Sequence, residues 1–335
     1  MIATVTLNPS LDEWVTLPAL RAGELNRALT FARYAGGKGI NVSRVVRELE
    51  GHTVAYTLAG GEDGAILRSL LRRLAIRHVC IPIDGSTRNN YKILARHPPC
   101  LTEINTPGPA VSREPLRQLA RHLLGYRPAP RAVALSGSLP PGVPSTIYRD
   151  WILTLRRRGI PTVLDGSGAA FAAGVSARPW LIKPNRQEAE ELLGERLRSP
   201  SALRRAARAL LARGPSLVIL SLGAEGALLA RANPPGMWMA RPPSVRVQSA
   251  VGAGDSLIGG FLFGWFRSLS LDPMGRGRKR RLASLAQREL VGSLVEAFRW
   301  GIAAGAATAM TPGTELCHRA DVLRLLPRVA VRQIA

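Results

Sequence analysis

The chain has few cysteines and few aromatic residues. Its 335 residues include three cysteines, Cys80, Cys100 and Cys317, and aromatic side chains make up 5% of the total. Cysteines this few and this far apart form neither a disulfide framework nor the spacing of a zinc site, which favours a reducing, cytoplasmic compartment. The small aromatic share argues against a protein that stacks bases or encloses a cation in an aromatic cage.

Acidic residues are also scarce. Asp and Glu number 23 against 46 Lys and Arg, which gives a net charge of +23. Lysine contributes only Lys38, Lys92, Lys183 and Lys279, so the basic residues are mostly arginine, a bias that a GC-rich coding sequence produces without a functional cause. A positive field would speed the arrival of anions, either small phosphorylated molecules or nucleic acid.

Long hydrophobic runs are absent. The most apolar stretch, residues 250–266, contains Asp255 and five glycines, whereas a membrane-spanning helix needs about 20 mostly apolar residues. The N-terminal segment has no basic residues ahead of its apolar stretch and no small-residue cleavage site, which indicates a first strand rather than a signal peptide. We therefore expect a cytoplasmic protein with no membrane contact.

The sequence does contain short β-branched or apolar runs that alternate with longer amphipathic stretches. The strand-like runs lie at 53–59, 132–135, 162–164, 180–182 and 217–220, and the helical patterns at 66–74, 145–157, 186–193 and 201–212. This alternation predicts βαβ units and an α/β fold with a mostly parallel sheet covered by helices. Ligands bind such sheets at the carboxyl ends of the strands.

Two regions break this alternation, and a third stretch is distinguished by its charge. Residues 11–34 and 88–105 have extended patterns without a following helix, so they could pair as a small separate antiparallel sheet or form irregular surface loops. Residues 272–281, DPMGRGRKRR, form a basic run between two apolar helices. The run lacks interleaved aromatic residues and a recognisable binding module, which favours a solvated loop over a nucleic-acid site.

The strongest local motif is QSAVGAGDS at residues 248–256, which follows a strand-like run at 244–247 and precedes an apolar helical pattern. Gly252 and Gly254 on either side of Ala253 would let backbone N–H groups turn inward at the start of the helix. Such a helix N-terminus is an anion-binding site.

Asp255 is an unexpected residue at such a site, because its carboxylate would repel the bound anion. The conflict is resolved if Asp255 is a general base that takes a proton from an attacking hydroxyl, while the amides stabilise a transferred phosphoryl group. An acid favoured near a helix start by the helix dipole explains the residue equally well.

A second motif, AGGKGIN, occupies residues 35–41. It is not a P-loop, because Lys38 is followed by Gly39 rather than by Ser or Thr. Gly37 and Gly39 would allow close backbone approach to a ligand. Lys38 would supply a positive charge for a phosphate, and Asn41 can both donate to and accept from sugar hydroxyls.

The third motif is KPN at residues 183–185, with Glu188 three residues beyond Asn185. An amide and a carboxylate at this spacing lie on one helix face and could hold hydrated Mg²⁺ near phosphates. The commoner explanation is a capping box, in which Asn185 caps the helix and Glu188 bonds back to it.

Seven motifs recur in this order in the ribokinase-like PfkB carbohydrate kinases, which the chain resembles from about residue 2 to about residue 325. They are NPSLD (8–12), GGKGIN (36–41), TR (87–88), SGSLPPG (136–142), KPN with Glu188, SLGAEG (221–226) and VGAGD (251–255). The sequence is most similar to the sugar-phosphate branch, and within it to members that phosphorylate fructose 1-phosphate. Tagatose-6-phosphate kinases and minor-type 6-phosphofructokinases stay open as alternatives.

The resemblance implies one kinase domain over residues 1–335, a Rossmann-type sandwich with a mainly parallel sheet and a small β lid from 11–34 and 88–105. The implied reaction transfers a phosphoryl group from ATP to a ketohexose phosphate with Mg²⁺, and some relatives also use a monovalent cation such as K⁺. Lids of this family often pair between subunits, which implies a homodimer. A sugar-phosphate sensor or nucleic-acid-binding protein is the non-enzymatic alternative, although a sensor has no need of Asp255.

The resemblance also implies a role for individual residues. Asp255 would be the base, and the transferred phosphoryl group would meet the amides of Gly252, Ala253 and Gly254. Sugar hydroxyls would bind Asp12, Gly37, Gly39 and Asn41, and the phosphate already on the sugar would bind Lys38, Arg88 and Ser138. The ATP side would consist of Lys183, Asn185, Ser221, Gly223 and Gly226, with Glu188 acting on Mg²⁺ through water.

Overall fold

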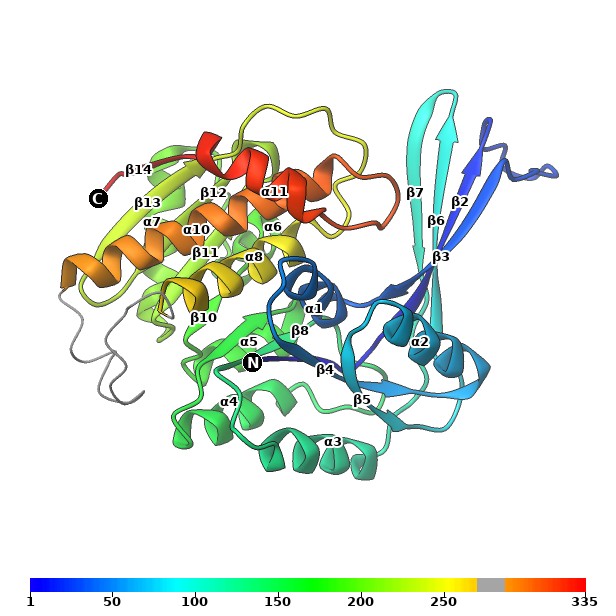
Figure 1. Cartoon of the computed structure of the whole chain (residues 1–335), viewed down its shortest axis with the longest axis horizontal. Helices are drawn as coiled ribbons and strands as arrows, with labels where there is room; N and C mark the ends of the chain where they lie inside the picture. Colours follow the sequence, from blue (N-terminus) through cyan, green and yellow to red (C-terminus); the bar gives the residue numbers. More distant parts are fainter. Residues whose placement is uncertain (270–286) are drawn as a thin grey trace.

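Two β-sheets organise the chain, which is described over residues 1–269 and 287–335 of a computed structural model (Figure 1). A ten-stranded central sheet forms the body, and a four-stranded sheet, called the small sheet below, projects from it. The basic run at 272–281 lies outside the described residues. Within them, no helix has the length and hydrophobicity needed to cross a bilayer.

The central sheet has the strand order β14-β13-β12-β11-β10-β9-β8-β1-β4-β5. Its parallel part comprises β1 (Ile2–Thr6), β4 (Thr53–Ala59), β5 (Arg77–Pro82), β8 (Ala132–Ser136), β9 (Thr162–Asp165), β10 (Leu181–Ile182) and β11 (Leu217–Ser221). An antiparallel extension is formed by β12 (Ala227–Arg231), β13 (Gly236–Arg241) and β14 (Ala330–Gln333). The predicted α/β fold with a mainly parallel sheet is confirmed.

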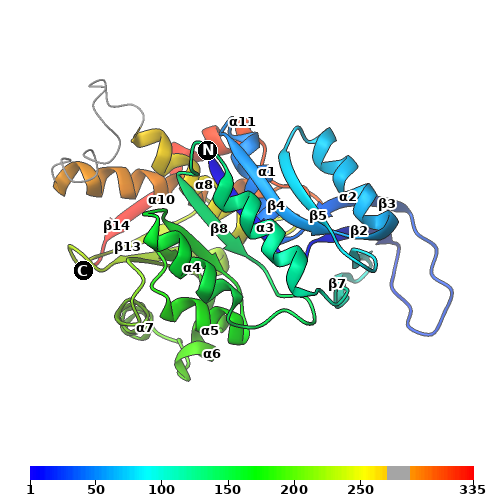
Figure 2. The ribbon, with the colours of Figure 1, turned by 90° about the horizontal axis from the view of Figure 1, so that it is seen from below.

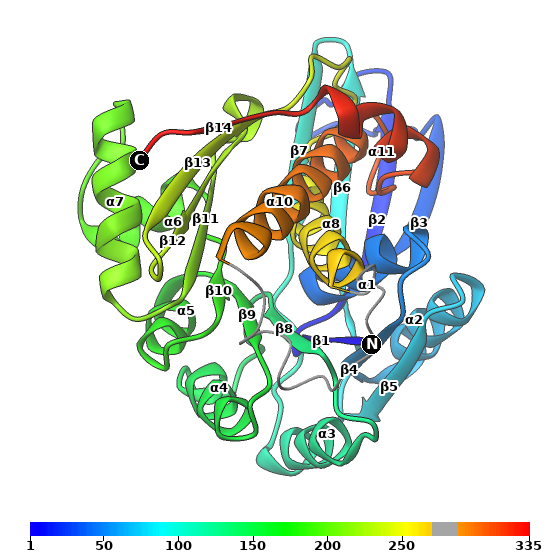
Figure 3. The same cartoon turned by 60° about the vertical axis from the view of Figure 1, so that its left-hand side comes forward.

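Helices cover both faces of the central sheet, as Figures 2 and 3 show. One layer contains α1 (Lys38–Glu48), α2 (Gly61–Arg73), α8 (Ala253–Ser268), α10 (Gln287–Ala309) and α11 (Arg319–Leu325). The other contains α3 (Arg113–Gly125), α4 (Ile147–Arg157), α5 (Gly168–Ser176), α6 (Arg186–Leu193) and α7 (Pro200–Ala212). Alternate residues of each strand point to opposite faces, so the strands contribute to both layers.

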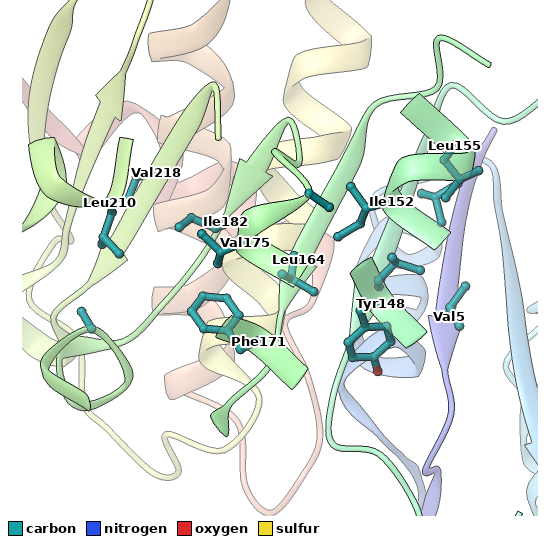
Figure 4. Close-up of a cluster of buried hydrophobic side chains, with 14 of the residues drawn as sticks. Val5, Tyr148, Ile152, Leu155, Leu164, Phe171, Val175, Ile182, Leu210 and Val218 are labelled. Carbon is teal, nitrogen blue, oxygen red and sulfur yellow. The ribbon is translucent and has the colours of Figure 1, made fainter. Parts of the chain in front are cut away.

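The second layer packs on the sheet through fully buried apolar side chains. Val5 of β1 and Leu164 of β9 belong to the same buried cluster as Tyr148 and Ile152 of α4 (Figure 4). Burial of each such side chain stabilises the fold by roughly 1.5–3 kcal/mol. This packing fixes the strands whose carboxyl ends carry the polar residues described below.

The small sheet has the order β3-β2-β6-β7, with β2 (Ser10–Leu17), β3 (Thr30–Gly36), β6 (Arg88–Arg96) and β7 (Pro99–Asn105). It consists of the two regions that broke the alternation. The prediction that it is antiparallel is wrong for its central pair, because β2 and β6 run parallel. β2 follows β1 and β6 follows β5, and β1 and β5 end at the same edge of the central sheet, so both strands leave it in one direction.

Residues 244–247, expected as a strand before the VGAGD turn, have no regular structure. Val247 is exposed, and the next N–H groups, of Gln248 and Ser249, donate to the carbonyl of Ala309 at the end of α10. The β-branched residues there predicted a strand, but β13 is paired with β12 on one side and with β14 on the other, so it offers no free edge to this segment.

Candidate active site

A cavity of about 1380 Å³ lies between the carboxyl ends of the central strands and one face of the small sheet. Every residue that the sequence analysis assigned to a site lines this cavity, except Gly39 and Glu188. The fold therefore brings together motifs that are spread over most of the chain. Their position agrees with the rule that open α/β sheets bind ligands beyond their carboxyl edge.

The VGAGD motif forms the N-terminus of α8. Gly252 is its N-cap with φ 79°, and a Cβ at this position would lie 2.6 Å from Leu316, so only glycine fits without rearrangement. A Cβ on Gly254 would lie 3.4 Å from Nζ of Lys183. The Ala253 N–H makes a long bond, 3.3 Å, to the carbonyl of Ala250. The start of α8 thus exposes backbone to the cavity beside a lysine.

Asp255 is buried, with 7% of its surface exposed, and its Oδ2 accepts a 2.8 Å hydrogen bond from Nδ2 of Asn41. Burial raises the pKa of Asp255 to about 6, and the charge of Asp165 adds to this effect, while Lys38 opposes it. A carboxylate with a pKa this close to neutrality is suited to general base catalysis.

Asn41 is engaged with protein groups at both ends of its amide. Its Nδ2 donates to Asp255, and its Oδ1 accepts from Nη1 of Arg44 at 3.2 Å. The sequence analysis assigned Asn41 to sugar hydroxyls. In the structure its amide orients the Asp255 carboxylate.

Asp165, at the end of β9, is a central residue of the site that the sequence analysis did not single out. Its buried Oδ1 accepts from Nζ of Lys183 at 3.2 Å and from Nζ of Lys38 at 3.3 Å. Burial alone would raise the pKa of Asp165, but the two lysines outweigh it and the pKa lies below its ordinary value. An acid at the last position of a buried parallel strand was the available signal.

Lys38 lies between the carboxylates of Asp165 and Glu188. Besides Asp165, its Nζ lies 3.6 Å from Oε1 of Glu188. The charge of Asp165 raises the pKa of Lys38 even though burial opposes the shift. Lys38 therefore stays an ammonium group at the centre of the cavity.

The capping box at α6 is present. Asn185 Oδ1 accepts from the Glu188 N–H, and Glu188 Oε2 accepts from the Asn185 N–H, both at 2.8 Å. This bonding leaves Oε1 of Glu188 as the oxygen turned toward Lys38. Over residues 1–269 and 287–335, no cluster of three or more His, Cys, Asp or Glu side chains could hold a metal ion by itself.

The small sheet contributes polar side chains to the opposite wall. Oδ1 of Asp12 accepts from Ser10 Oγ at 2.8 Å and from Asn90 Nδ2 at 3.4 Å. Ser138 Oγ accepts from Asn8 Nδ2 at 3.2 Å. These bonds orient the predicted sugar-side residues without filling the cavity.

Arg88 begins β6, as expected, and bonds to backbone rather than to an acid. It donates to the carbonyls of Thr106 at 2.9 Å, Asn8 at 3.0 Å and Pro9 at 3.4 Å. These bonds join the start of β6 to Thr106, just after β7, and to the segment between β1 and β2. They use three of its five N–H groups and leave one on each terminal nitrogen.

At three positions of the predicted site, close packing or a positive φ requires glycine. A Cβ on Gly39 would lie 2.5 Å from Oγ1 of Thr6, so this glycine lets α1 approach β1, and it does not line the cavity. Gly37 has φ 117°, and Gly226 has φ 96° with the Ala240 carbonyl against it. Gly37 and Gly226 line the cavity as predicted, as do Ser221 and Gly223.

The α/β fold, the buried carboxylate at a helix N-terminus and the lysines beside it have the features expected of a phosphotransferase. The family model of the pfkB family carbohydrate kinases matches residues 5–321, and the chain belongs to that family.

Two relatives show which carbohydrate kinases of this family the chain is similar to. The chain is 37% identical to the 1-phosphofructokinase of Escherichia coli (strain K12) over 263 residues, which cover 78% of this chain and 83% of that protein. It is 32% identical to the 1-phosphofructokinase of Bacillus subtilis (strain 168) over 334 residues, which cover 100% of both.

Among solved structures, the phosphofructokinase-2 of Escherichia coli in complex with potassium is similar, with a TM-score of 0.84, 30% identity and 98% coverage of both chains. Ribokinase from Giardia lamblia matches with a TM-score of 0.77 at 17% identity, covering 98% of both chains. The ribokinase-like fold implied by the motifs is confirmed.

Proposed function

We propose that this protein transfers the γ-phosphoryl group of ATP to fructose 1-phosphate and forms fructose 1,6-bisphosphate. The observation that carries the reaction is Asp255, a buried carboxylate with a pKa raised to about 6 at a helix N-terminus inside the shared cavity. The substrate is supported by the two relatives named 1-phosphofructokinase, which are 37% and 32% identical to the chain.

In the proposed reaction, Asp255 takes the proton of a sugar hydroxyl, and the hydroxyl oxygen attacks the γ-phosphorus as the ADP oxygen leaves. A positioned base of this kind contributes about 10²–10⁴ in rate. The amides of Gly252, Ala253 and Gly254 stabilise the oxygens of the transferred group. Asn41 keeps the carboxylate turned toward the cavity.

The ATP side comprises Lys183, Asn185, Ser221, Gly223 and Gly226. Mg²⁺ would neutralise phosphate charge there, and such ions are usually held by phosphates and one or two carboxylates. The residues present fit it, because Oδ2 of Asp165 is buried with no hydrogen-bond partner and Oε1 of Glu188 is free of the capping box. Glu188 would act on the ion through water.

The sugar side comprises Asp12 and Gly37 for hydroxyls, and Lys38, Arg88 and Ser138 for the phosphate already present. Arg88 retains one N–H on each terminal nitrogen for this purpose. The small sheet serves as the lid of a single kinase domain.

The outer face of the lid supports a homodimer. Phe31, Tyr91 and Ile104 are 59%, 41% and 50% exposed there, a cluster of apolar side chains typical of a contact surface. A monovalent cation site is supported by the relative whose structure contains potassium.

Steady-state kinetics with ATP on fructose 1-phosphate, fructose 6-phosphate, tagatose 6-phosphate and free fructose test the proposal. We expect the highest kcat/KM for fructose 1-phosphate. A preference for either 6-phosphate would assign one of the alternative kinase activities. Equal turnover of free fructose and fructose 1-phosphate would refute a phosphate site, and no ATP consumption with any sugar would leave only a sensor or a nucleic-acid-binding protein.

A further inference from the structure

Lys92 lies on the wall of the cavity and has no role in the reaction described so far. It belongs to β6, where alternate residues point to the same face, so it shares the face of Arg88 and Asn90. All three side chains line the cavity. Only 4% of Lys92 is exposed, and a buried lysine is uncommon unless it is paired.

The partner of Lys92 is Glu103, which lies directly opposite it on β7. Nζ of Lys92 is 3.0 Å from Oε2 of Glu103. The side chain of Glu103 is 38% exposed, whereas that of Lys92 is 6% exposed. Solvent screens such a half-exposed carboxylate, which makes it a weaker partner than a buried one. An ammonium group carries three N–H donors, and this bond occupies one of them.

Three other cations that line the cavity, Lys38, Lys183 and Arg88, are more firmly engaged. Lys38 and Lys183 share the buried Asp165. Arg186, which belongs to α6 and not to the small sheet, donates to the exposed Glu225 at 2.6 Å. Arg88 is bonded to three backbone carbonyls. On the small sheet, Lys92 and Arg88 each keep two spare N–H donors. The half-exposed carboxylate of Glu103 is a more easily displaced partner than the three backbone carbonyls that hold Arg88.

The position of Lys92 along β6 also fits the far end of a sugar phosphate. Asn90 bonds to Asp12, where sugar hydroxyls are proposed to bind. Lys92 lies two residues farther along the strand, or ~7 Å beyond Asn90. A ligand whose hydroxyls contact Asp12 would therefore extend toward Lys92 with a group remote from Asp255.

We propose that Lys92 joins Arg88, on the same face of β6, in binding the phosphate group that the sugar already carries, and that this phosphate displaces Glu103 from the lysine. The inference rests on the proposed function, because it names a phosphate-binding residue of that same site. A phosphate with nearly two negative charges and three acceptor oxygens is a stronger partner for an ammonium group than one half-exposed carboxylate. No covalent step is involved.

The first test is Lys92→Met, which keeps the length of the aliphatic stem and removes the charge. We expect KM for fructose 1-phosphate to rise roughly tenfold to a hundredfold, the range for loss of a charge-assisted hydrogen bond. kcat and KM for ATP should stay within about twofold of the wild-type values, because the lost contact is remote from the reacting hydroxyl. Arg96→Met is the matched control, since Arg96 lies on the same strand and face, is exposed and does not line the cavity.

Glu103→Gln gives a second test that leaves the lysine in place. Without a competing carboxylate, the phosphate should bind Lys92 more readily, so KM for fructose 1-phosphate should fall severalfold. An unchanged or higher KM would contradict the displacement of Glu103. This variant also keeps the proposal testable if Lys92→Met does not fold.

The outcomes separate the inference from the proposed function. If the wild-type enzyme consumes no ATP with any sugar phosphate, the proposed function is wrong. If it phosphorylates fructose 1-phosphate and folded Lys92→Met has an unchanged KM, the role of Lys92 is wrong and the function stands. An equal rise in KM for ATP and for the sugar phosphate would indicate a structural role for Lys92 and overturn the inference.

Discussion

At the scale of single residues, the chemistry of the site depends on how opposing effects balance at Asp255. Burial and the nearby charge of Asp165 raise its pKa, whereas Lys38, Asn41 and Lys183 lower it, and the result is a pKa of about 6. A base with this pKa is largely ionised at pH 7 and becomes protonated as the pH falls through 6. Loss of activity is therefore expected on the acid side.

We predict that kcat, measured with both substrates saturating, falls about tenfold per pH unit below pH 6 and is flat above pH 7. Saturation matters because the phosphate of the free sugar also titrates near pH 6, and kcat reports only groups of the bound complex. A flat profile from pH 5 to pH 8 would show that Asp255 does not act as the base.

Replacement of the base gives a second prediction. Asp255→Asn keeps the shape of the side chain but cannot accept a proton, so kcat should fall by at least about 10². ATP affinity, measured by calorimetry, should change by less than about threefold. Asp150→Asn, an exposed position on α4, is the control and should leave kcat unchanged. An Asp255→Asn enzyme with more than about a tenth of wild-type kcat would exclude the assignment.

The sequence predicted some residues of the site better than others. Gly252, Gly254 and Asp255 are adjacent, so their spacing alone indicates an anion site with an acid beside it. Asp165 and Lys92 were missed because their positions in the site depend on distant partners. Asp165 bonds to Lys38, which is 127 residues away in the sequence. Lys92 lines the cavity only because the small sheet folds over the carboxyl ends of the central strands.

At the scale of elements, the sequence predicted the bounds of some strands and helices, but it did not predict which strands pair with one another. β4 and α6 have the predicted bounds, 53–59 and 186–193, because each has a clear periodicity and α6 also has a capping box. The parallel centre of the small sheet depends on where β1 and β5 end. The irregular segment at 244–247 likewise reflects which strands occupy that edge of the sheet.

The outer face of the small sheet carries the third prediction. By register, Tyr91 lies beside Ile104 on the face opposite Lys92. If this face forms the dimer contact, Tyr91→Asp with Ile104→Asp should lower the mass measured by light scattering toward the 36.0 kDa of one chain. Leu153→Asp, which changes an exposed leucine on α4, should leave the mass unchanged. A wild-type protein that is already monomeric would contradict the proposed homodimer.

At the scale of the whole molecule, the net charge of +23 acts mainly as a field. Replacing Arg276, Arg278, Lys279, Arg280 and Arg281 with neutral residues lowers that charge by five. We predict an unchanged kcat at 0.15 M salt, together with weaker nucleic-acid binding in a shift assay at low salt, because counterions screen such a field. A folded variant with a collapsed kcat would show that the basic run belongs to the active site.

The strand order also has a consequence for the synthesis of this protein on the ribosome. β1 is made first but lies inside the central sheet between β4 and β8, and β14 closes the far edge. All strands of the small sheet have been made once residue 105 is added, whereas α8 packs on α10, and Gly252 lies against Leu316. The segments of the small sheet are therefore synthesised early, whereas the helices that hold Asp255 in place are complete only near the end of translation.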